Sequence, residues 1–151
     1  GISDHQNREL SSDEVHQIFT DTYVNLSAPI QLDDFYFMHK KVYHTTVSLT
    51  VNGEQFELTG RGNGRFDAVS NALHQLVGDY VLSTYTEHAL ETGAKSQAAS
   101  YVGIETPDGK TYWGAGVDSD IILSSVYALV SAVNRMLAAR GEQPSAGAAQ
   151  S

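Results

Sequence analysis

Two alternating patterns of apolar and polar residues, each followed by a helical one, account for most of the chain. In the first alternating run, over residues 30–58, Val47, Leu49 and Val51 occupy every second position. Side chains of a strand point alternately to its two faces, so this pattern predicts strands with one buried face. Asn52-Gly53 is a strong signal for a tight hairpin, and residues 55–59 are expected to pair back antiparallel.

A helical repeat follows this hairpin. Apolar residues recur there at positions i, i+3, i+4, i+7 and i+8, namely Val69, Ala72, Leu73, Leu76 and Val77. This spacing places them on one face of an amphipathic helix.

The second half of the chain repeats the order of the first. Residues 80–90 and 98–105 are strand-like, Pro107-Asp108-Gly109 is a turn sequence, and residues 110–114 are expected to form the return strand. A final helix is predicted over residues 119–139. The predicted fold class is α+β: two strand-strand-strand-helix (βββα) units related by internal pseudo-symmetry, with helices packed on antiparallel sheet.

The ends of the chain have a different character. Ser11 and Glu14 have the spacing of a capping box, which predicts a short helix near the N-terminus. Residues 1–30 are therefore interpreted as a linker helix and connector, and residues 31–139 as one domain. Residues 140–151, rich in small and polar side chains, are expected to form a disordered tail.

Composition narrows the classes of partner. The 151 residues carry 18 acidic and 9 basic side chains, a formal net charge of −9, which argues against nucleic acid or an anionic membrane as partner. No apolar run approaches the roughly 20 residues of a membrane span. The chain contains no cysteine, which excludes disulfides and thiolate chemistry, and the cytoplasm is the expected location.

The sequence offers no arrangement typical of catalysis. None of the six histidines forms a metal-ligand spacing with another histidine or with carboxylates. A nucleophile elbow and a phosphate-binding loop are also missing from the sequence. We therefore expect no catalytic residue, metal or cofactor on this chain.

Two glycine patterns suggest a binding site instead. Gly60-Arg61-Gly62-Asn63-Gly64 and Gly114-Ala115-Gly116 each lie between a strand-like run and a predicted helix. A glycine turn that leads into a helix leaves free N–H groups, which suit a carboxylate or phosphate. The alternative is a plain turn that binds nothing. Asp118 similarly fits either a helix cap or a partner for an ammonium group, and Tyr85 either a pocket or ordinary core.

These segments together resemble a known family. The segments that carry the resemblance are, in order, Gly60-Arg61-Gly62-Asn63-Gly64 with Asp67-Ala68, Tyr85-Thr86-Glu87-His88-Ala89, Gln97-Ala98, Gly116-Val117-Asp118-Ser119-Asp120-Ile121, Ser124-Ser125 and Ala132-Val133-Asn134-Arg135. Together they resemble the C-terminal regulatory domain of 2-isopropylmalate synthase over about residues 35–137. The resemblance implies a homodimeric domain that binds L-leucine and inhibits the first committed step of leucine synthesis. It also implies that this chain senses rather than catalyses, with the catalytic domain of the parent acyltransferase as its partner and residues 11–30 as the transmission element.

The resemblance further implies a set of leucine-binding residues: Gly62, Asn63, Gly64, Phe66, Asp67, Leu82, Tyr85, Ala89, Ser96, Val117, Asp118 and Ser119. In this interpretation main-chain amides hold the leucine carboxylate and Asp67, Asp118 or carbonyls hold its ammonium. Leu82, Tyr85, Ala89 and Val117 enclose the isobutyl group.

Two departures and two alternatives accompany this resemblance. Arg65 stands where the family commonly has proline, and Gly93-Ala94-Lys95-Ser96 replaces a short acidic stretch. The isoleucine-responsive domain of citramalate synthase is closely related and remains an alternative. A dimerisation domain without ligand binding is the other.

Overall fold

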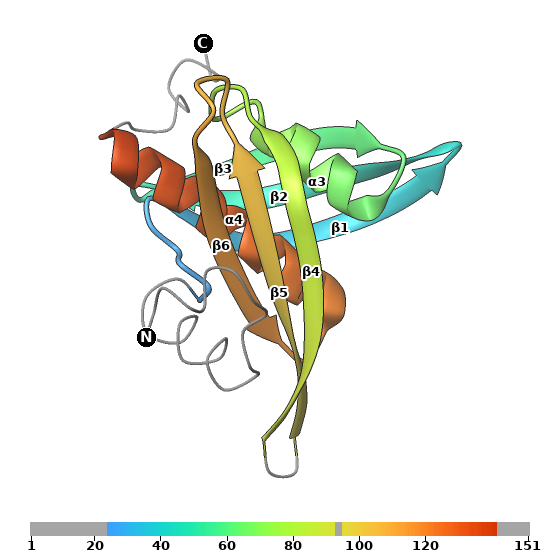
Figure 1. The fold of residues 1–151 in the computed structure, drawn as a ribbon. Helices are drawn as coiled ribbons and strands as arrows, with labels where there is room; N and C mark the ends of the chain where they lie inside the picture. Colours follow the sequence, from blue (N-terminus) through green and yellow to red (C-terminus); the bar gives the residue numbers. More distant parts are fainter. Residues whose placement is uncertain (1–23, 93–94, 142–151) are drawn as a thin grey trace, which may run out of the picture.

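The computed structural model describes residues 24–92 and 95–141, and within them a βββα unit occurs twice (Figure 1). The first unit consists of β1 (Ile30–Lys40), β2 (Val42–Val51), β3 (Glu54–Gly62) and α3 (Arg65–Leu73). The second unit consists of β4 (Val81–Thr92), β5 (Lys95–Glu105), β6 (Thr111–Asp118) and α4 (Ile121–Arg140). The predicted fold class is confirmed. The helix predicted from Ser11 and Glu14, and residues 142–151 of the predicted tail, lie outside the described residues.

Each unit contributes one antiparallel three-stranded sheet, with strand orders β1-β2-β3 and β4-β5-β6. The predicted hairpin at Asn52-Gly53 joins β2 to β3, and both residues have the positive φ, 51° and 88°, that such a turn requires. The register shifts between Leu32 and Asp34 in β1, and between Leu82 and Thr84 in β4. An irregularity at the same place in both first strands supports the internal pseudo-symmetry.

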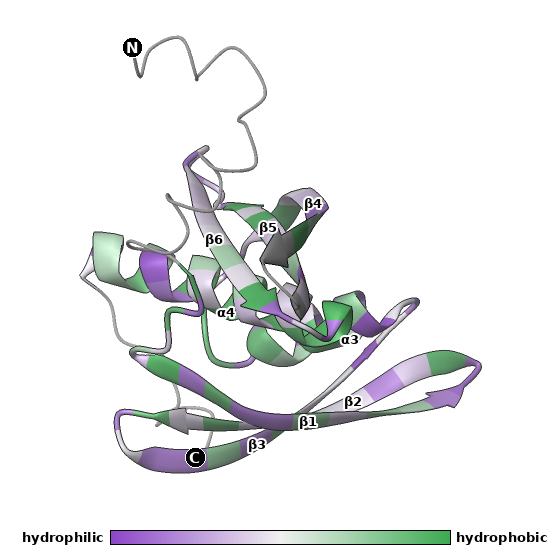
Figure 2. Ribbon diagram, turned by 90° about the horizontal axis from the view of Figure 1, so that it is seen from below, coloured by the Kyte–Doolittle hydropathy of each residue, from purple (hydrophilic) through white to green (hydrophobic). Residues whose placement is uncertain are grey.

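The two helices lie between the two sheets (Figure 2). α3 packs on β2 and β3, whereas α4 packs on β5 and β6 and also contacts β1. The largest fully buried side chains come from both sheets and both helices, among them Leu49, Leu73, Ile104, Leu129 and Met136. Contrary to the expectation that no apolar run approaches the length of a membrane span, α4 is long and apolar enough to cross one, but 67% of its most apolar window is buried in the fold. We therefore interpret it as the core helix.

The glycine patterns lie mostly in strands, and only Asn63-Gly64 forms a turn before a helix, as the sequence predicted. Gly60 and Gly62 belong to β3, and Gly114 and Gly116 to β6, which is longer than the predicted return strand. A Cβ atom on Gly60 would lie 2.3 Å from the Ala68 carbonyl oxygen, and one on Gly114 would lie 2.3 Å from that of Ala128. These glycines are needed because each helix approaches its strand closely.

Residues 24–30 run beside the second unit before β1 begins. Val24 forms a parallel bridge with Ala115 of β6, and the Asn25 amide donates to the Ala115 carbonyl oxygen at 2.9 Å. Farther along, buried Asn134 of α4 accepts a bond from the Ile30 amide at 2.9 Å and donates to the Leu26 and Ile30 carbonyl oxygens. This connector is thus held to both β6 and α4.

Candidate ligand-binding site

No side chain caps the backbone N–H groups at the start of α3 in the described part of the chain. Gly64 is the N-cap residue and has an extended conformation. As a glycine it has no side chain that could accept a bond from these N–H groups. The first helical bond runs from the Ala68 amide to the Gly64 carbonyl oxygen at 3.0 Å. The amides of residues 65–67 precede this bond, as in every helix start, and they favour a negatively charged partner.

A cleft of about 390 Å³ opens beside this helix start. It brings together four of the predicted site residues, Gly62, Asn63 and Asp67 from the first unit and Leu82 from the second. The cleft therefore lies where the two units meet, as a site between the halves of the domain requires.

Five further residues line this cleft and were missed in the sequence: Ser70, Asn71, His74, Tyr80 and Val81. A signal was available for two of them. Asp67, Asn71 and His74 have the spacing i, i+4 and i+7, which places polar side chains on one face of a helix and its following turn. Only the apolar stripe of this helix entered the sequence interpretation.

Tyr80 and His74 form one wall of the cleft. The Tyr80 hydroxyl lies 3.0 Å from the Ser70 hydroxyl and donates to the Ser70 carbonyl oxygen at 3.2 Å, and burial raises the pKa of Tyr80 to about 12. The His74 ring stacks on the Tyr80 ring with centroids 4.0 Å apart, and burial lowers the pKa of His74. Both rings therefore favour their neutral forms, and this wall carries no charge near neutral pH.

Phe66 and Tyr85 form a second contact between the units. Their rings meet edge to face with centroids 4.8 Å apart, so the first turn of α3 touches β4. The Tyr85 side chain is 39% exposed, and its hydroxyl contacts the Ser125 hydroxyl on α4. Two more predicted site residues thus lie together, with an apolar ring surface open to solvent.

The start of α4 differs from the start of α3. The Asp120 carboxylate accepts bonds from the Ile122 and Leu123 amides at 2.8 and 3.2 Å. The Asp118 carboxylate accepts one from the Asp120 amide at 2.8 Å. The expectation that both helix starts offer free amides is therefore wrong for α4, because an aspartate cap occupies amides that the glycine cap of α3 leaves open.

The remaining predicted residues lie away from the cleft. Val117 packs against a separate small cluster of Leu90, Ala99 and Ala115. Its backbone N–H and C=O both bond to the Asn25 side chain, at 3.0 and 3.2 Å. The predicted residue Ser119 lies between the end of β6 and the start of α4. Ala89 and Ser96 are exposed on β4 and β5, whose ends project past α4 (Figure 1).

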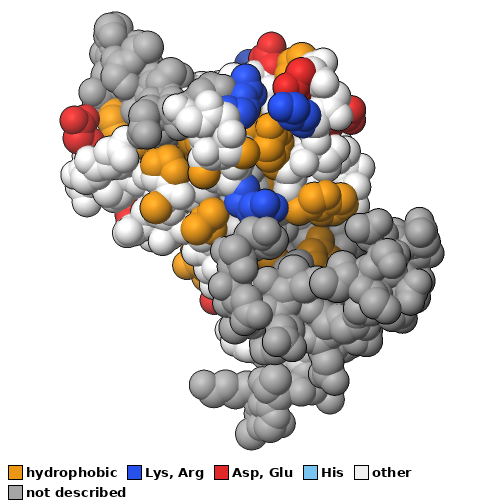
Figure 3. Space-filling view, turned by 60° about the vertical axis from the view of Figure 1, so that its left-hand side comes forward, with side chains coloured by type: hydrophobic (Ala, Val, Ile, Leu, Met, Phe, Trp, Pro, Cys, Tyr) orange, Lys and Arg blue, Asp and Glu red, His pale blue; other side chains and the backbone are white. Residues whose placement is uncertain are grey.

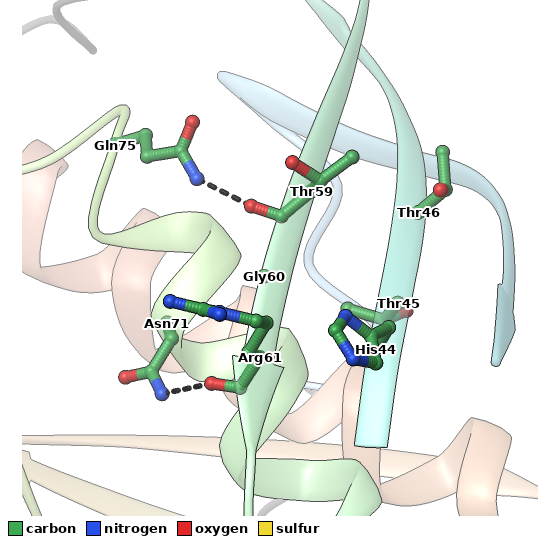
Figure 4. A pocket seen from close by; sticks show the side chains of 8 residues that line it. All are labelled: His44, Thr45, Thr46, Thr59, Gly60, Arg61, Asn71 and Gln75. Atoms are coloured by element: carbon green, nitrogen blue, oxygen red, sulfur yellow. Dashed lines mark hydrogen bonds between the residues drawn. The ribbon is translucent and has the colours of Figure 1, made fainter. Parts of the chain in front are cut away.

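A larger hollow of about 490 Å³ lies at the edge of β3 and contains none of the predicted site residues (Figure 4). Here Asn71 and Gln75 of the α3 segment donate to the carbonyl oxygens of Arg61 and Thr59. Arg135 of α4 donates to the Trp113 carbonyl oxygen at 3.2 Å in the same way at the edge of β6. These side chains satisfy edge-strand carbonyls, which explains their positions without a ligand.

Among the described residues, the histidines and acidic side chains form no metal-binding cluster, and Arg65 lies against aromatic rings. Within residues 24–92 and 95–141, no group of three or more His, Asp or Glu is placed to hold a metal. Arg65 lies over the rings of Phe37 and Tyr43, 5.9 and 5.5 Å from their centroids. On the face seen in Figure 3, apolar side chains are scattered among polar ones and charges of both signs occur.

Known proteins resemble this chain over nearly its whole length. The model of the LeuA allosteric (dimerisation) domain family matches residues 9–137. A protein named 2-isopropylmalate synthase from Desulfitobacterium hafniense (strain Y51) is 48% identical over 137 residues, which covers 90% of this chain and 25% of that protein. Proteins of the same name from Helicobacter hepaticus (strain ATCC 51449 / 3B1) and Rhizobium meliloti (strain 1021) are 42% and 34% identical, with 90% of this chain covered in each. The chain thus spans about a quarter of the length of these curated relatives.

Proposed function

The chain belongs to the LeuA allosteric (dimerisation) domain family, and we propose that it is the leucine-sensing domain of a 2-isopropylmalate synthase. In this proposal it binds L-leucine as a homodimer and lowers the activity of the catalytic domain to which it is joined. That domain would transfer an acetyl group from acetyl-CoA to 2-oxoisovalerate. The names of the relatives support the parent activity, and the cleft supports the sensing role.

The observation that carries the proposal is the meeting of the uncapped α3 start with apolar groups of the second unit. The amides of residues 65–67 suit the leucine carboxylate, and the Asp67 carboxylate suits its ammonium. Leu82 and the contacting rings of Phe66 and Tyr85 offer apolar surface for the isobutyl group. Burial of such a group favours binding by about 1.5–3 kcal/mol.

The predicted residues outside the cleft fit a site that is completed in the homodimer. Ala89 and Ser96 are exposed on the projecting ends of β4 and β5. A twofold pair places the same surface of each copy against the other. In this proposal the second copy covers the projecting strands and brings Ala89 and Ser96 toward the ligand.

The connector is the proposed route to the catalytic domain. Asn25 bonds both backbone groups of Val117, and Val117 leads through Asp118 and Ser119 into α4. Leucine transmits a signal only if it favours one arrangement of these contacts over another. The support for this route is the direct contact between residues 24–25 and a strand that carries predicted site residues.

Titration calorimetry with leucine, isoleucine and valine tests the proposal. We expect leucine to bind most tightly. Gly64→Ala adds a methyl group at the α3 start that meets only the Asp67 carboxylate at 3.9 Å, so the fold should tolerate it. This methyl group lies beside the amides proposed for the carboxylate, and we expect about tenfold weaker leucine binding.

The matched control is Gly78→Ala. Gly78 also has open space around it but does not line the cleft, so leucine affinity should be unchanged. Gly62→Ala is unsuitable, because its methyl group would lie 2.6 Å from the Ala68 amide nitrogen and displace α3. Absence of heat with all three amino acids would contradict leucine sensing, and tighter binding of isoleucine would indicate the other effector.

A further inference from the structure

A chain of hydroxyl groups joins Tyr85 to the first turn of α4. The Tyr85 hydroxyl contacts the Ser125 hydroxyl. Ser125 is 2% exposed, and its hydroxyl donates to the Ile121 carbonyl oxygen at 2.8 Å. A serine hydroxyl has one hydrogen to donate, so Ser125 accepts from Tyr85 and the Tyr85 hydrogen is used inside the protein.

The opposite side of Tyr85 is held by the first unit. The edge-to-face contact with Phe66 places the Tyr85 ring against the first turn of α3. Tyr85 therefore touches both helix starts, through its ring at α3 and through its hydroxyl at α4. Tyr85 as a whole remains 39% exposed between them.

We propose that Ser125 is a positioning residue for amino-acid selectivity, because its bond to the Tyr85 hydroxyl leaves the ligand an apolar ring and no donor from Tyr85. The inference rests on the proposed function, since it assumes that the side chain of a bound amino acid contacts Tyr85. A hydrocarbon side chain then gives up no hydrogen bonds to water when it packs against this ring. A polar side chain of the same shape loses its bonds to water and gains no donor in return.

Ser124 provides a matched comparison within the same turn of α4. Ser124 is also buried, and its hydroxyl donates to the same Ile121 carbonyl oxygen at 2.9 Å. Ser124 contacts the Ser100 hydroxyl at 2.8 Å, and Ser125 contacts the same hydroxyl at 3.4 Å and also the Tyr85 hydroxyl. Ser124→Ala and Ser125→Ala thus remove the same group from the same buried turn, and only the second removes the α4 hydroxyl that contacts Tyr85.

The test compares L-leucine with L-asparagine, which has nearly the same shape and a polar amide. Calorimetry on the whole 151-residue chain gives the ratio of the two affinities. In Ser125→Ala the Tyr85 hydroxyl is released toward the ligand. We expect leucine to bind about fivefold more weakly and the leucine-to-asparagine ratio to fall about tenfold. Ser124→Ala should keep the wild-type ratio.

A double-mutant comparison separates positioning from a general loss of structure. Tyr85→Phe removes the hydroxyl that Ser125 holds, so Ser125→Ala should leave the ratio unchanged in that background. Ser125→Thr keeps the hydroxyl and should restore the wild-type ratio. An equal fall of the ratio in Ser124→Ala and Ser125→Ala, or a fall that persists with Tyr85→Phe, would overturn the proposal.

Failure of the proposed function has a different signature. If the wild-type chain binds neither amino acid, leucine sensing is contradicted, and the positioning by Ser125 is decided by NMR of labelled tyrosine. The Tyr85 ring signals should then move in Ser125→Ala and stay in place in Ser124→Ala. Unmoved signals in both variants would also overturn the positioning of Tyr85 by Ser125.

Discussion

At the scale of single residues, His74 is the member of the cleft wall whose chemistry responds most directly to pH. Burial lowers its pKa, and the nearby Asp79 carboxylate and the Gly78 backbone oppose this shift only in part. Its ring stacks on buried Tyr80, so protonation would place a charge against an apolar surface. Neutral His74 is therefore the form that the folded chain stabilises.

We predict that the free energy of unfolding decreases as the pH falls below about 6.5, and that His74 contributes to this decrease. Unfolded His74 gains its proton near pH 6.5, whereas folded His74 gains it only at lower pH, so acid favours the unfolded state. Urea unfolding at about pH 7.5 and pH 5.5 measures the effect. The decrease should be smaller in His74→Gln than in wild type, with His88→Gln, at an exposed position, as control.

Two outcomes of this comparison would contradict a role of His74 in the pH dependence. If wild type and His74→Gln lose the same free energy of unfolding between the two pH values, His74 does not contribute. A larger change in His88→Gln than in His74→Gln would assign the pH dependence elsewhere among the six histidines.

At the scale of elements, α3 and α4 occupy the same place in their units but are capped differently at their N-termini. α3 begins after Gly64, which provides no side-chain cap, and α4 begins after Asp120, which binds two amides of its own helix. The α3 start therefore keeps backbone donors that the α4 start uses internally. This difference explains why one unit, and not both, offers the candidate anion site.

α4 also fixes the connector through one buried side chain. Asn134 forms three hydrogen bonds with the backbone of Leu26 and Ile30, at 2.8–2.9 Å. We predict that Asn134→Ala lowers the free energy of unfolding by about 2–4 kcal/mol, because it leaves buried backbone groups without partners. Chemical unfolding measured by circular dichroism checks this.

Asn71→Ala is the matched control for that experiment. It removes the same amide from α3, where the side chain is exposed and makes one bond to the Arg61 carbonyl oxygen. Water can replace this bond, so the loss should be about 1 kcal/mol or less. Equal losses in the two variants would mean that Asn134 does not anchor the connector.

At the scale of the whole molecule, the connector extends the second sheet at its free edge. The parallel bridge from Val24 to Ala115 and the bonds of Asn25 to Val117 place residues 24–25 beside β6. The β3 edge of the other sheet has Asn71 of α3 and Gln75 of the following turn at the corresponding place. Residues 24–25 are therefore joined to the second unit, whereas Pro29, next to β1, accepts a bond from the Asn52 amide of the first unit at 3.4 Å.

We predict that Asn25→Ala lowers the hydrogen-exchange protection of the Val117 amide, because this amide donates to the Asn25 side chain. Exchange measured by NMR checks the amide directly. Val47 in the central strand β2 serves as the internal reference and should exchange as slowly as in wild type. Unchanged protection of Val117 would show that the connector is not held there in solution.

The sequence by itself determined the order of elements and the fold class. The alternation at Val47, Leu49 and Val51 and the repeat that begins at Val69 were sufficient, because a strand and a helix each show the period of their own buried face. The predicted helix was too long, since α3 ends at Leu73 and the last residues of the repeat, Leu76 and Val77, lie in the turn after it. The turn at Asn52-Gly53 was equally clear, since few residues accept its backbone angles. The resemblance to a family rested on an ordered set of short segments, which also needs no structure.

Only the tertiary structure decided which polar groups meet. Tyr85 contacts Ser125, Asn25 contacts Val117 and Asn134 contacts Ile30, and each pair is separated by many residues in the chain. The structure also placed Gly60, Gly62, Gly114 and Gly116 in strands, left Gly64 in the turn before α3, and closed the α4 start with Asp120. The reason is physical: periodicity records that a face is buried, but the partner of a side chain depends on which other element packs there.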